Sequence, residues 1–315
     1  MLLKHWRSWV IARAARTDSH DMASPLLHNC HGARPSEVFE EFFAGGIADL
    51  AFASEARQIA VGARSGHIFL LDQSGLRIAE DRTFSDIRLL RLSATAEIGA
   101  CVVSGNRLIC FNQNLKKLWD VSITGNITGL AVSPYGSHIA FSTEMNRLHV
   151  VSVDRKEVFM VDTRRPMEHL EFLAEHPHLI AAAEFGQICR FDLKGRELWN
   201  ENLIANAGAM SVAEGPDRIF LAAFNHGVQV YDLDGNQLGT FAVDGIPAKV
   251  SAARTRSRIA ALTLENRIYW LNFEGTIQWA ADISGDPPQH ICTGPLGDRL
   301  LIGTQSGCLL QVSWP

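Results

Sequence analysis

The sequence predicts an all-β protein, a single seven-bladed β-propeller with four antiparallel strands per blade. Apolar residues recur about every forty residues, turn-forming residues recur between them, and the first predicted strand and the last blade each lack a partner. A period of this length with four short strands per unit is typical of propeller blades. The chain of 315 residues is compatible with one domain because propellers often exceed the average domain size.

When the seven units of about forty residues are aligned, one apolar residue of each predicted first strand falls at the same position, which we call the first-strand column. Predicted second strands such as IAFST at 139–143 are nearly continuous apolar runs, as expected for strands buried between neighbouring blades. Gly and Asn at the following hairpins tolerate the positive φ that such turns require. The first-strand column consists of Leu50, Leu90, Leu130, Leu170, Met210, Val250 and Ile291.

The segment SEVFEEFFA at 36–44 reads as a strand with no hairpin partner before it, and Val38 lies forty residues before Ile78. Residues 298–315 supply a second and a third strand without a fourth. We therefore predict that strand 36–44 completes the last blade and closes the ring, which removes an open sheet edge. Deleting residues 1–35 should then leave the fold intact, whereas deleting residues 1–45 should open it.

Residues 1–35 are predicted to form a flexible N-terminal arm preceding the propeller at 36–315. Apolar residues of the acid-free segment 2–16 fall on one side of a helical projection, which is compatible with an amphipathic docking helix or an organelle transit peptide. A third interpretation is translation from Met22. His20, His28, Cys30 and His31 lie in the same arm, but their spacing matches no metal signature, and we predict no metal site.

The composition is that of an ordinary soluble globule, and its net charge of −5 argues against a nucleic-acid partner. We also predict no cofactor, because the sequence has no Gly-rich phosphate-binding loop. Arg254, Arg256 and Arg258 are the strongest basic cluster, and no aromatic residues accompany them. Six irregularly spaced cysteines predict reduced thiols and a cytoplasmic location. We expect Cys101 and Cys110 to face each other across a hairpin as two packed thiols.

Two segments resemble known propeller families. DLKGRELW at 192–199 and NFEGTIQW at 272–279 resemble the tryptophan-bearing end of PQQ-like repeats, and the spacing over residues 36–315 resembles WD40-type repeats. The resemblance implies the fold only. The Gly-His and Trp-Asp dipeptides of WD40 blades are missing in register, since Trp119-Asp120 occurs once, and the adjacent cysteines of PQQ enzymes are absent.

Charged residues repeat at equivalent hairpins and form the predicted partner-binding set. If the blades align, these side chains lie on one face of the ring, where a binding partner is best sought. The alternative is that they are solvated turn charges that pair weakly. The set is Arg107, Arg147, Arg267, Glu144, Glu184 and Glu265.

The function predicted from these observations is a non-catalytic scaffold that binds a protein or peptide partner on the loop face. One alternative is a propeller enzyme, a hydrolase or lyase with its site at the channel mouth, which would need inward carboxylates or histidines in several blades. A second alternative is a scaffold tethered to a membrane through residues 1–16. We predict no enzyme, because the starts of the first strands are apolar: Ile47, Ile87, Ile127, Met167, Ala207 and Pro247.

Overall fold

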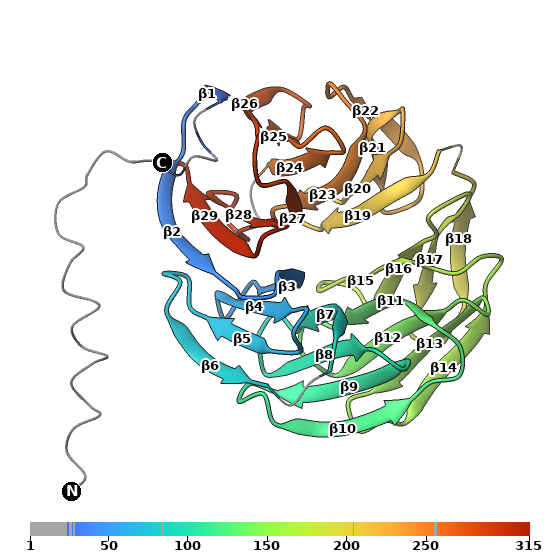
Figure 1. Ribbon diagram of the computed structural model, residues 1–315. Helices are drawn as coiled ribbons and strands as arrows, with labels where there is room; N and C mark the ends of the chain where they lie inside the picture. Colours follow the sequence, from blue (N-terminus) through green and yellow to red (C-terminus); the bar gives the residue numbers. More distant parts are fainter. Residues whose placement is uncertain (1–23, 25–26, 28, 83–84, 204, 255–256) are drawn as a thin grey trace, which may run out of the picture.

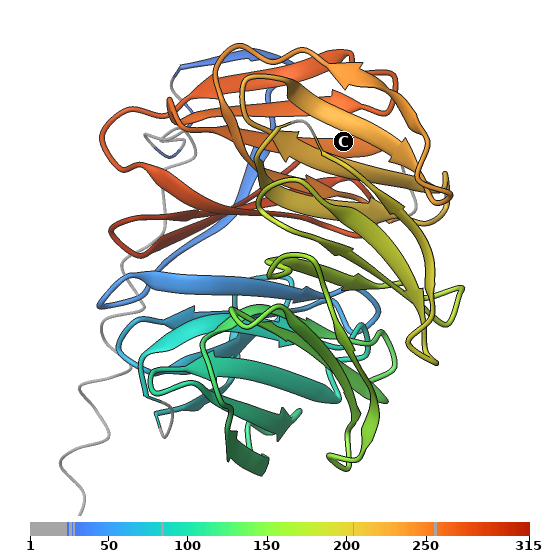
Figure 2. The same cartoon turned by 90° about the vertical axis from the view of Figure 1, so that its right-hand side faces the viewer.

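The computed structural model describes residues 24, 27, 29–82, 85–203, 205–254 and 257–315. Seven antiparallel sheets stand around a central axis and form a closed ring (Figures 1 and 2). This arrangement confirms the predicted all-β, seven-bladed propeller. The described residues contain no helix with the length and hydropathy that a membrane crossing requires.

The strands of blades 1 to 4 follow the chain from the inner to the outer edge of each sheet. Blade 1 consists of β3 (Ile47–Ala53), β4 (Gln58–Ala63), β5 (Ile68–Leu71) and β6 (Arg77–Asp81). Blade 2 consists of β7 (Ile87–Leu92), β8 (Ile98–Val103), β9 (Arg107–Asn112) and β10 (Lys117–Ser122). Blade 3 consists of β11 (Ile127–Val132), β12 (His138–Thr143), β13 (Arg147–Ser152) and β14 (Glu157–Asp162). Blade 4 consists of β15 (His169–Phe172), β16 (His178–Ala182), β17 (Ile188–Asp192) and β18 (Glu197–Glu201).

Blades 5 to 7 continue the pattern, with two additions from the N-terminal part of the chain. Blade 5 consists of β19 (Ala207–Ala213), β20 (Arg218–Ala223), β21 (Gly227–Asp232) and β22 (Gln237–Phe241). Blade 6 consists of β23 (Pro247–Ala252), β24 (Arg258–Thr263), β25 (Arg267–Asn272), β26 (Ile277–Asp282) and the added β1 (Cys30–Gly32). Blade 7 consists of β27 (Pro288–Thr293), β28 (Arg299–Thr304), β29 (Cys308–Ser313) and β2 (Ser36–Phe42).

The ring closes as the sequence predicts. Strand β2 pairs antiparallel with β29, from Ser36 opposite Ser313 to Phe42 opposite Cys308. Phe43 follows the strand, is buried, and donates its backbone N–H to the carbonyl of Gly307 at 2.8 Å. Strand β2, from the N-terminal part of the chain, and β29, the last strand, thus belong to one sheet, and their pairing closes the ring.

The fourth strand of every blade contains a β-bulge at the same repeat position, between residues 37 and 39 in β2 and between 77 and 79 in β6, for example. A bulge turns the side chains on either side of it toward different faces. The bulged apolar residue therefore projects outward, 36% to 51% exposed, in six blades: Val38, Ile78, Leu118, Val158, Leu198 and Leu238.

In every blade but the fifth, where Gly239 follows the bulge, the residue after the bulge turns toward the next blade. Phe39 of β2 lies over Gly75, where a β-carbon would sit 2.6 Å from the Phe39 ring, and Trp199 lies over Gly235 in the same way at 2.9 Å. Both glycines have a positive φ, so the turn conformation and the close approach each favour glycine. The Nε1 of Trp199 also donates to the carbonyl of Leu233 at 2.7 Å, which ties blade 4 to blade 5.

Part of the predicted arm belongs to the folded ring. Strand β1 pairs with β26 as a fifth strand of blade 6, and Leu27 is 1% exposed inside the apolar cluster between blades 6 and 7. Residues 1–23, with the predicted helix at 2–16 and His20, lie outside the described residues, as does His28. We call residues 24–35 the N-terminal segment; the flexibility of the arm as a whole stays a prediction.

The predicted pairing of Cys101 with Cys110 is wrong by one residue. Cys101 lies opposite Ile109 and Cys110 lies opposite Ala100, because the hairpin turn is centred on Gly105. A shift of one residue sends a side chain to the other face of the sheet. Cys101 accordingly packs against blade 1 and Cys110 against blade 3, and burial raises the pKa of the Cys110 thiol to about 12.

Candidate functional site in the central channel

The three predicted arginines lie at hairpins between second and third strands, and each pairs with an acid of its own blade. Arg147 Nε lies 3.5 Å from Asp162, and Arg267 Nε lies 3.7 Å from Asp282. Arg107 forms a bidentate pair with Asp120 at the equivalent place in blade 2. We call this face of the ring the hairpin face, and the face with the turns between first and second strands the turn face.

Two of the three predicted glutamates hold loops at the hairpin face. Glu144 accepts hydrogen bonds from Asn126 N at 3.1 Å and Asn126 Nδ2 at 2.7 Å, and Glu265 accepts one from Ile246 N at 2.9 Å. Hydrogen bonds to these loops lower the pKa of both carboxyl groups. Glu184 donates its backbone N–H to the carboxylate of Glu168 at 2.6 Å. The six predicted residues thus share a face, and their binding of a partner stays a prediction.

Sequence reasoning missed three apolar side chains beside these glutamates. Met145, Phe185 and Leu264 lie next to Glu144, Glu184 and Glu265 at hairpin tips and are 51%, 45% and 57% exposed. The signal was available for Met145 and Phe185, because each stands at the hairpin centre, where blades 1, 2, 5 and 7 have Ser, Gly or Asn. We call these three residues the hairpin-tip patch.

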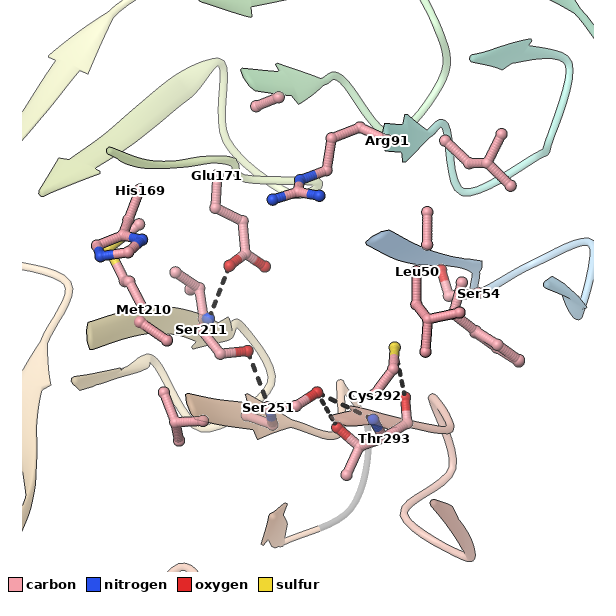
Figure 3. Close-up of a pocket in the computed structure, with 18 of the residues that line it drawn as sticks. Leu50, Ser54, Arg91, His169, Glu171, Met210, Ser211, Ser251, Cys292 and Thr293 are labelled. Carbon is pink, nitrogen blue, oxygen red and sulfur yellow. Dashed lines mark hydrogen bonds between the residues drawn. The ribbon is translucent and has the colours of Figure 1, made fainter. Parts of the chain in front are cut away.

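The central channel is a second candidate site. It encloses a cavity of about 360 Å³ lined by the first strands of all seven blades (Figure 3). Its lining extends to Ser54, Pro134 and Pro295, which lie in or beside turns between first and second strands. The cavity therefore reaches toward the turn face.

The channel lining is polar, contrary to the apolar lining expected from the strand starts. Ile47, Ile87, Ile127, Met167, Ala207 and Pro247 are buried between blades instead. A β-bulge follows the strand start, between Ile47 and Asp49 in β3 for example, and it reverses which face the later residues occupy. The residues on either side of the first-strand column therefore reach the channel. They include Asp49, His169, Lys249 and His290 before the column residue, and Arg91, Glu171, Ser211, Ser251 and Cys292 after it.

The channel acids bond backbone N–H groups of neighbouring blades. Each first strand is the inner edge of its sheet, so its outward N–H groups need partners from elsewhere. Asp49 Oδ2 accepts from Leu90 N at 2.8 Å and from Arg91 Nη1 at 2.7 Å. Glu171 Oε2 accepts from Val212 N at 3.0 Å (Figure 3). These carboxylates join blade 1 to blade 2 and blade 4 to blade 5.

Two serines repeat the same contact with a neutral oxygen. Ser211 Oγ accepts from Ala252 N at 3.0 Å, and Ser251 Oγ accepts from Thr293 N at 2.9 Å (Figure 3). The repeat position after the column residue thus bridges blades 4, 5, 6 and 7 in succession. Side-chain oxygens at this position in three consecutive blades, 4, 5 and 6, therefore hold the first strand of the following blade.

Burial in the channel shifts the pKa values of several groups. Desolvation raises the pKa of Glu171 to about 7, against the opposing effect of Arg254. It lowers the pKa of His169 to about 4, and the Nε2 of that histidine donates to the carbonyl of Ala207 at 3.1 Å. Desolvation also lowers the pKa of Lys249 and of His290. Both histidines are therefore neutral near pH 7, where Glu171 exchanges its proton.

Of the predicted basic cluster, Arg254 is engaged inside the ring. Its Nη1 donates to Ser54 Oγ at 3.0 Å and its Nη2 lies 3.5 Å from Glu214. Arg256 lies outside the described residues. Among the residues that the structure describes, no group of three or more His, Cys, Asp or Glu side chains is placed to hold a metal ion.

Comparison with known proteins shows the fold and leaves the family open. No protein-family model matches the sequence, and no curated protein matches it. Among solved structures, the chain is similar to the Cps50 (Swd1) β-propeller domain of Myceliophteria thermophila, with 14% sequence identity and a TM-score of 0.75. The match covers 89% of this chain and 100% of that domain. The WD40-like resemblance is thus shown at the level of the fold.

Proposed function

We propose that this protein is a non-catalytic interaction scaffold that binds a protein or peptide partner on its hairpin face. The observation that carries the proposal is the hairpin-tip patch, in which Met145, Phe185 and Leu264 are exposed on one face of a rigid ring. Exposed apolar groups surrounded by polar ones are typical of protein interaction sites.

The charged residues of this face complete the proposed surface. Each patch residue has a glutamate beside it. Arg147 and Arg267 lie at two of the same hairpins, Arg107 lies at the equivalent hairpin of blade 2, and acids hold all three guanidinium groups. Side chains already fixed by ion pairs lose little freedom when a partner binds. We therefore expect the partner to present apolar anchors between polar groups.

Site-specific photo-crosslinking in native lysate tests this proposal. A photoreactive residue in place of Phe185 should give a discrete crosslinked species, which the additional substitutions Met145→Ser and Leu264→Ser should abolish. The matched control places the photoreactive residue at Tyr135, which is 63% exposed on the turn face. Equal crosslinking from both faces, or none from Phe185, would contradict the proposal.

The channel supports a second candidate, a propeller enzyme of the hydrolase or lyase class. The observation in its favour is Glu171, whose pKa of about 7 suits proton transfer at neutral pH, beside His169 and Cys292 in one cavity. Hydrolysis of an ester or glycoside panel that falls at least about a hundredfold in Glu171→Gln would favour this candidate. Turnover that the variant retains would count against it.

We also propose that the protein is cytoplasmic and does not bind nucleic acid. A membrane tether through residues 1–16 is the less favoured alternative. The proposal is supported by the six free cysteines, three of them buried, since reduced thiols are the rule in that compartment. Fractionation of cells that express the full chain tests it, and recovery with membranes that requires residues 1–16 would favour the tether.

A further inference from the structure

The acids and the cations of the channel differ in how many of their hydrogen-bonding groups are already engaged. Asp49 accepts three hydrogen bonds, from Leu50 N, Leu90 N and Arg91 Nη1. Glu214 accepts from Ala174 N at 2.6 Å and Glu175 N at 2.8 Å. With the bond from Val212 N to Glu171, both carboxylates that line the cavity, Asp49 and Glu171, have an internal donor, as has the nearby Glu214.

The channel cations keep unused donors. Lys249 makes no hydrogen bond or ion pair with any residue that the structure describes, although it lines the cavity. Arg91 bonds its described neighbours through Nη1 alone, to Asp49 and to its neighbour's carbonyl, Leu90 O. Lys249, Arg91 and Asp49 influence one another electrostatically, so they share one region of the cavity. The Lys249 ammonium group and the remaining donors of the Arg91 guanidinium group thus belong to side chains that line one cavity.

We propose that the central channel binds a carboxylate, held between Lys249 and Arg91. A carboxylate can accept bonds from both groups at once, and charge-assisted bonds of this kind are about twice as strong as neutral ones. A cavity of about 360 Å³ falls within the range of small-molecule sites. The source is either a small free dicarboxylate or an acidic side chain of a peptide, since both present the same group.

The channel also sets the pH dependence of this binding. An ionised Glu171 repels a bound carboxylate, so binding should strengthen as that residue is protonated below about pH 7. The other charged groups around Glu171 are Arg91, Arg254 and Glu214, with the Cys292 thiol beside them. Burial lowers the pKa of His169, of His290 and of Lys249, whereas it raises the pKa of Glu171 to about 7. Glu171 is therefore the carboxyl group of the channel that we expect to titrate near neutral pH.

Calorimetric titration of the full chain at low salt tests the proposal with two probes. One is succinate, and the other is an acetylated tetraglutamate peptide whose control is the matching tetraglutamine peptide. Succinate binding alone indicates a small-molecule site, whereas tighter binding of the glutamate peptide indicates an acidic segment. Failure of both glutamate and succinate to bind, or equal binding of the glutamine peptide, would overturn the proposal.

Three variants separate this site from other effects. Lys249→Met removes no hydrogen bond or ion pair between residues that the structure describes, and it should weaken binding roughly tenfold, the loss expected for one charge-assisted bond. Lys156→Met, on an exposed turn, should leave binding unchanged. Glu171→Gln should retain binding and lose its pH dependence. Equal affinity of Lys249→Met and wild type would overturn the proposal.

The carboxylate site does not rest on the proposed scaffold function. The hairpin-tip substitutions Met145→Ser and Leu264→Ser should leave succinate or peptide affinity as in wild type, because these residues do not line the channel. Loss of crosslinking in those variants with intact carboxylate binding would support both proposals separately.

Discussion

The interfaces of blades 4–5 and of blades 6–7 occupy the same place in the repeat and use different chemistry. Between blades 4 and 5, the buried Arg190 donates to Leu233 O at 2.9 Å, where the Trp199 indole also donates. Between blades 6 and 7, Trp270 stands at the repeat position of Arg190 and stacks on Trp314 at 4.4 Å. One interface is linked by hydrogen bonds and the other by stacked aromatic rings.

The apolar interface depends on residues from outside the repeat. Leu27 fills the cluster around Trp270, Trp279 and Trp314, and Trp314 Nε1 donates to Ala33 O at 2.7 Å. The Trp279 Nε1 is buried with no partner among the described residues, unlike its equivalent Trp199. The comparison shows that the repeat determines where neighbouring blades touch. The side chains at each interface determine whether hydrogen bonds or apolar packing hold the blades together, and whether residues outside the repeat are needed.

The largest expected effect is loss of ring closure. Deletion of residues 1–45 removes β2, its ladder with β29 and the buried Phe43, so most of the roughly 5–15 kcal/mol of unfolding free energy should disappear. Deletion of residues 1–23 should leave the melting temperature unchanged. Thermal unfolding followed by circular dichroism measures both, and similar melting of the two truncated proteins would contradict the closure.

The N-terminal segment should have the next largest effect, and here the structure revises the expectation that deleting residues 1–35 is harmless. Leu27→Ala removes a fully buried side chain and should cost about 2–4 kcal/mol in urea unfolding. Deletion of residues 1–35 should cost at least as much, because it also removes β1. The exposed Leu238→Ala, on the outer strand of blade 5, is the control and should cost under about 0.5 kcal/mol.

The same substitution at the two interfaces should have unequal effects. Trp199→Phe removes the hydrogen bond to Leu233 O, whereas Trp279→Phe removes an indole N–H that has no partner. Trp199→Phe should therefore cost about 1 kcal/mol more than Trp279→Phe, the net worth of a buried hydrogen bond. Urea denaturation at matched protein concentration measures the difference, and a larger cost for Trp279→Phe would show that packing outweighs the hydrogen bond.

The smallest expected effect is a pH dependence confined to the blade 4–5 interface. The pKa of Glu171 is about 7 in the folded protein and 4.5 for an unperturbed carboxyl group. The unfolded chain therefore releases this proton first as pH rises, and stability falls between about pH 4.5 and 7. Glu171→Gln should therefore gain stability relative to wild type as the pH rises from 4 to 8, because only the wild type must keep a buried carboxylate ionised at pH 8. An equal difference at both pH values would contradict this assignment.

The sequence predicted the blades, their order and the closing strand because these depend on features that repeat along the chain. Apolar columns forty residues apart and Gly or Asn at hairpins specify strands and turns locally, so a single misplaced residue changes little. The candidate site was harder to predict. It depends on which residues flank the first-strand column, and Asp49 and Glu171 contact backbone groups about forty residues away.

Register explains the two errors. Cys101 and Cys110 were paired one residue out of register, and the channel was expected to be lined by strand starts such as Ile47. In both cases the sequence predicts the strand correctly, but it does not determine which of two successive residues faces a given side of the sheet. Successive side chains point to opposite faces, so an error of one residue assigns a buried side chain to the channel and a channel side chain to the core.

The sequence by itself determined the seven-bladed ring and its closure by Ser36–Phe42, since periodic hydrophobicity and turn chemistry are written locally. Only the tertiary structure decided which ionisable groups meet in the channel, how Leu27 enters the blade 6–7 interface and which hairpin tips are exposed. The physical reason is that the positions of β-bulges and of hairpin turns determine which face of the sheet each side chain occupies. Contacts between blades then arise from residues whose separation in sequence carries no local signal.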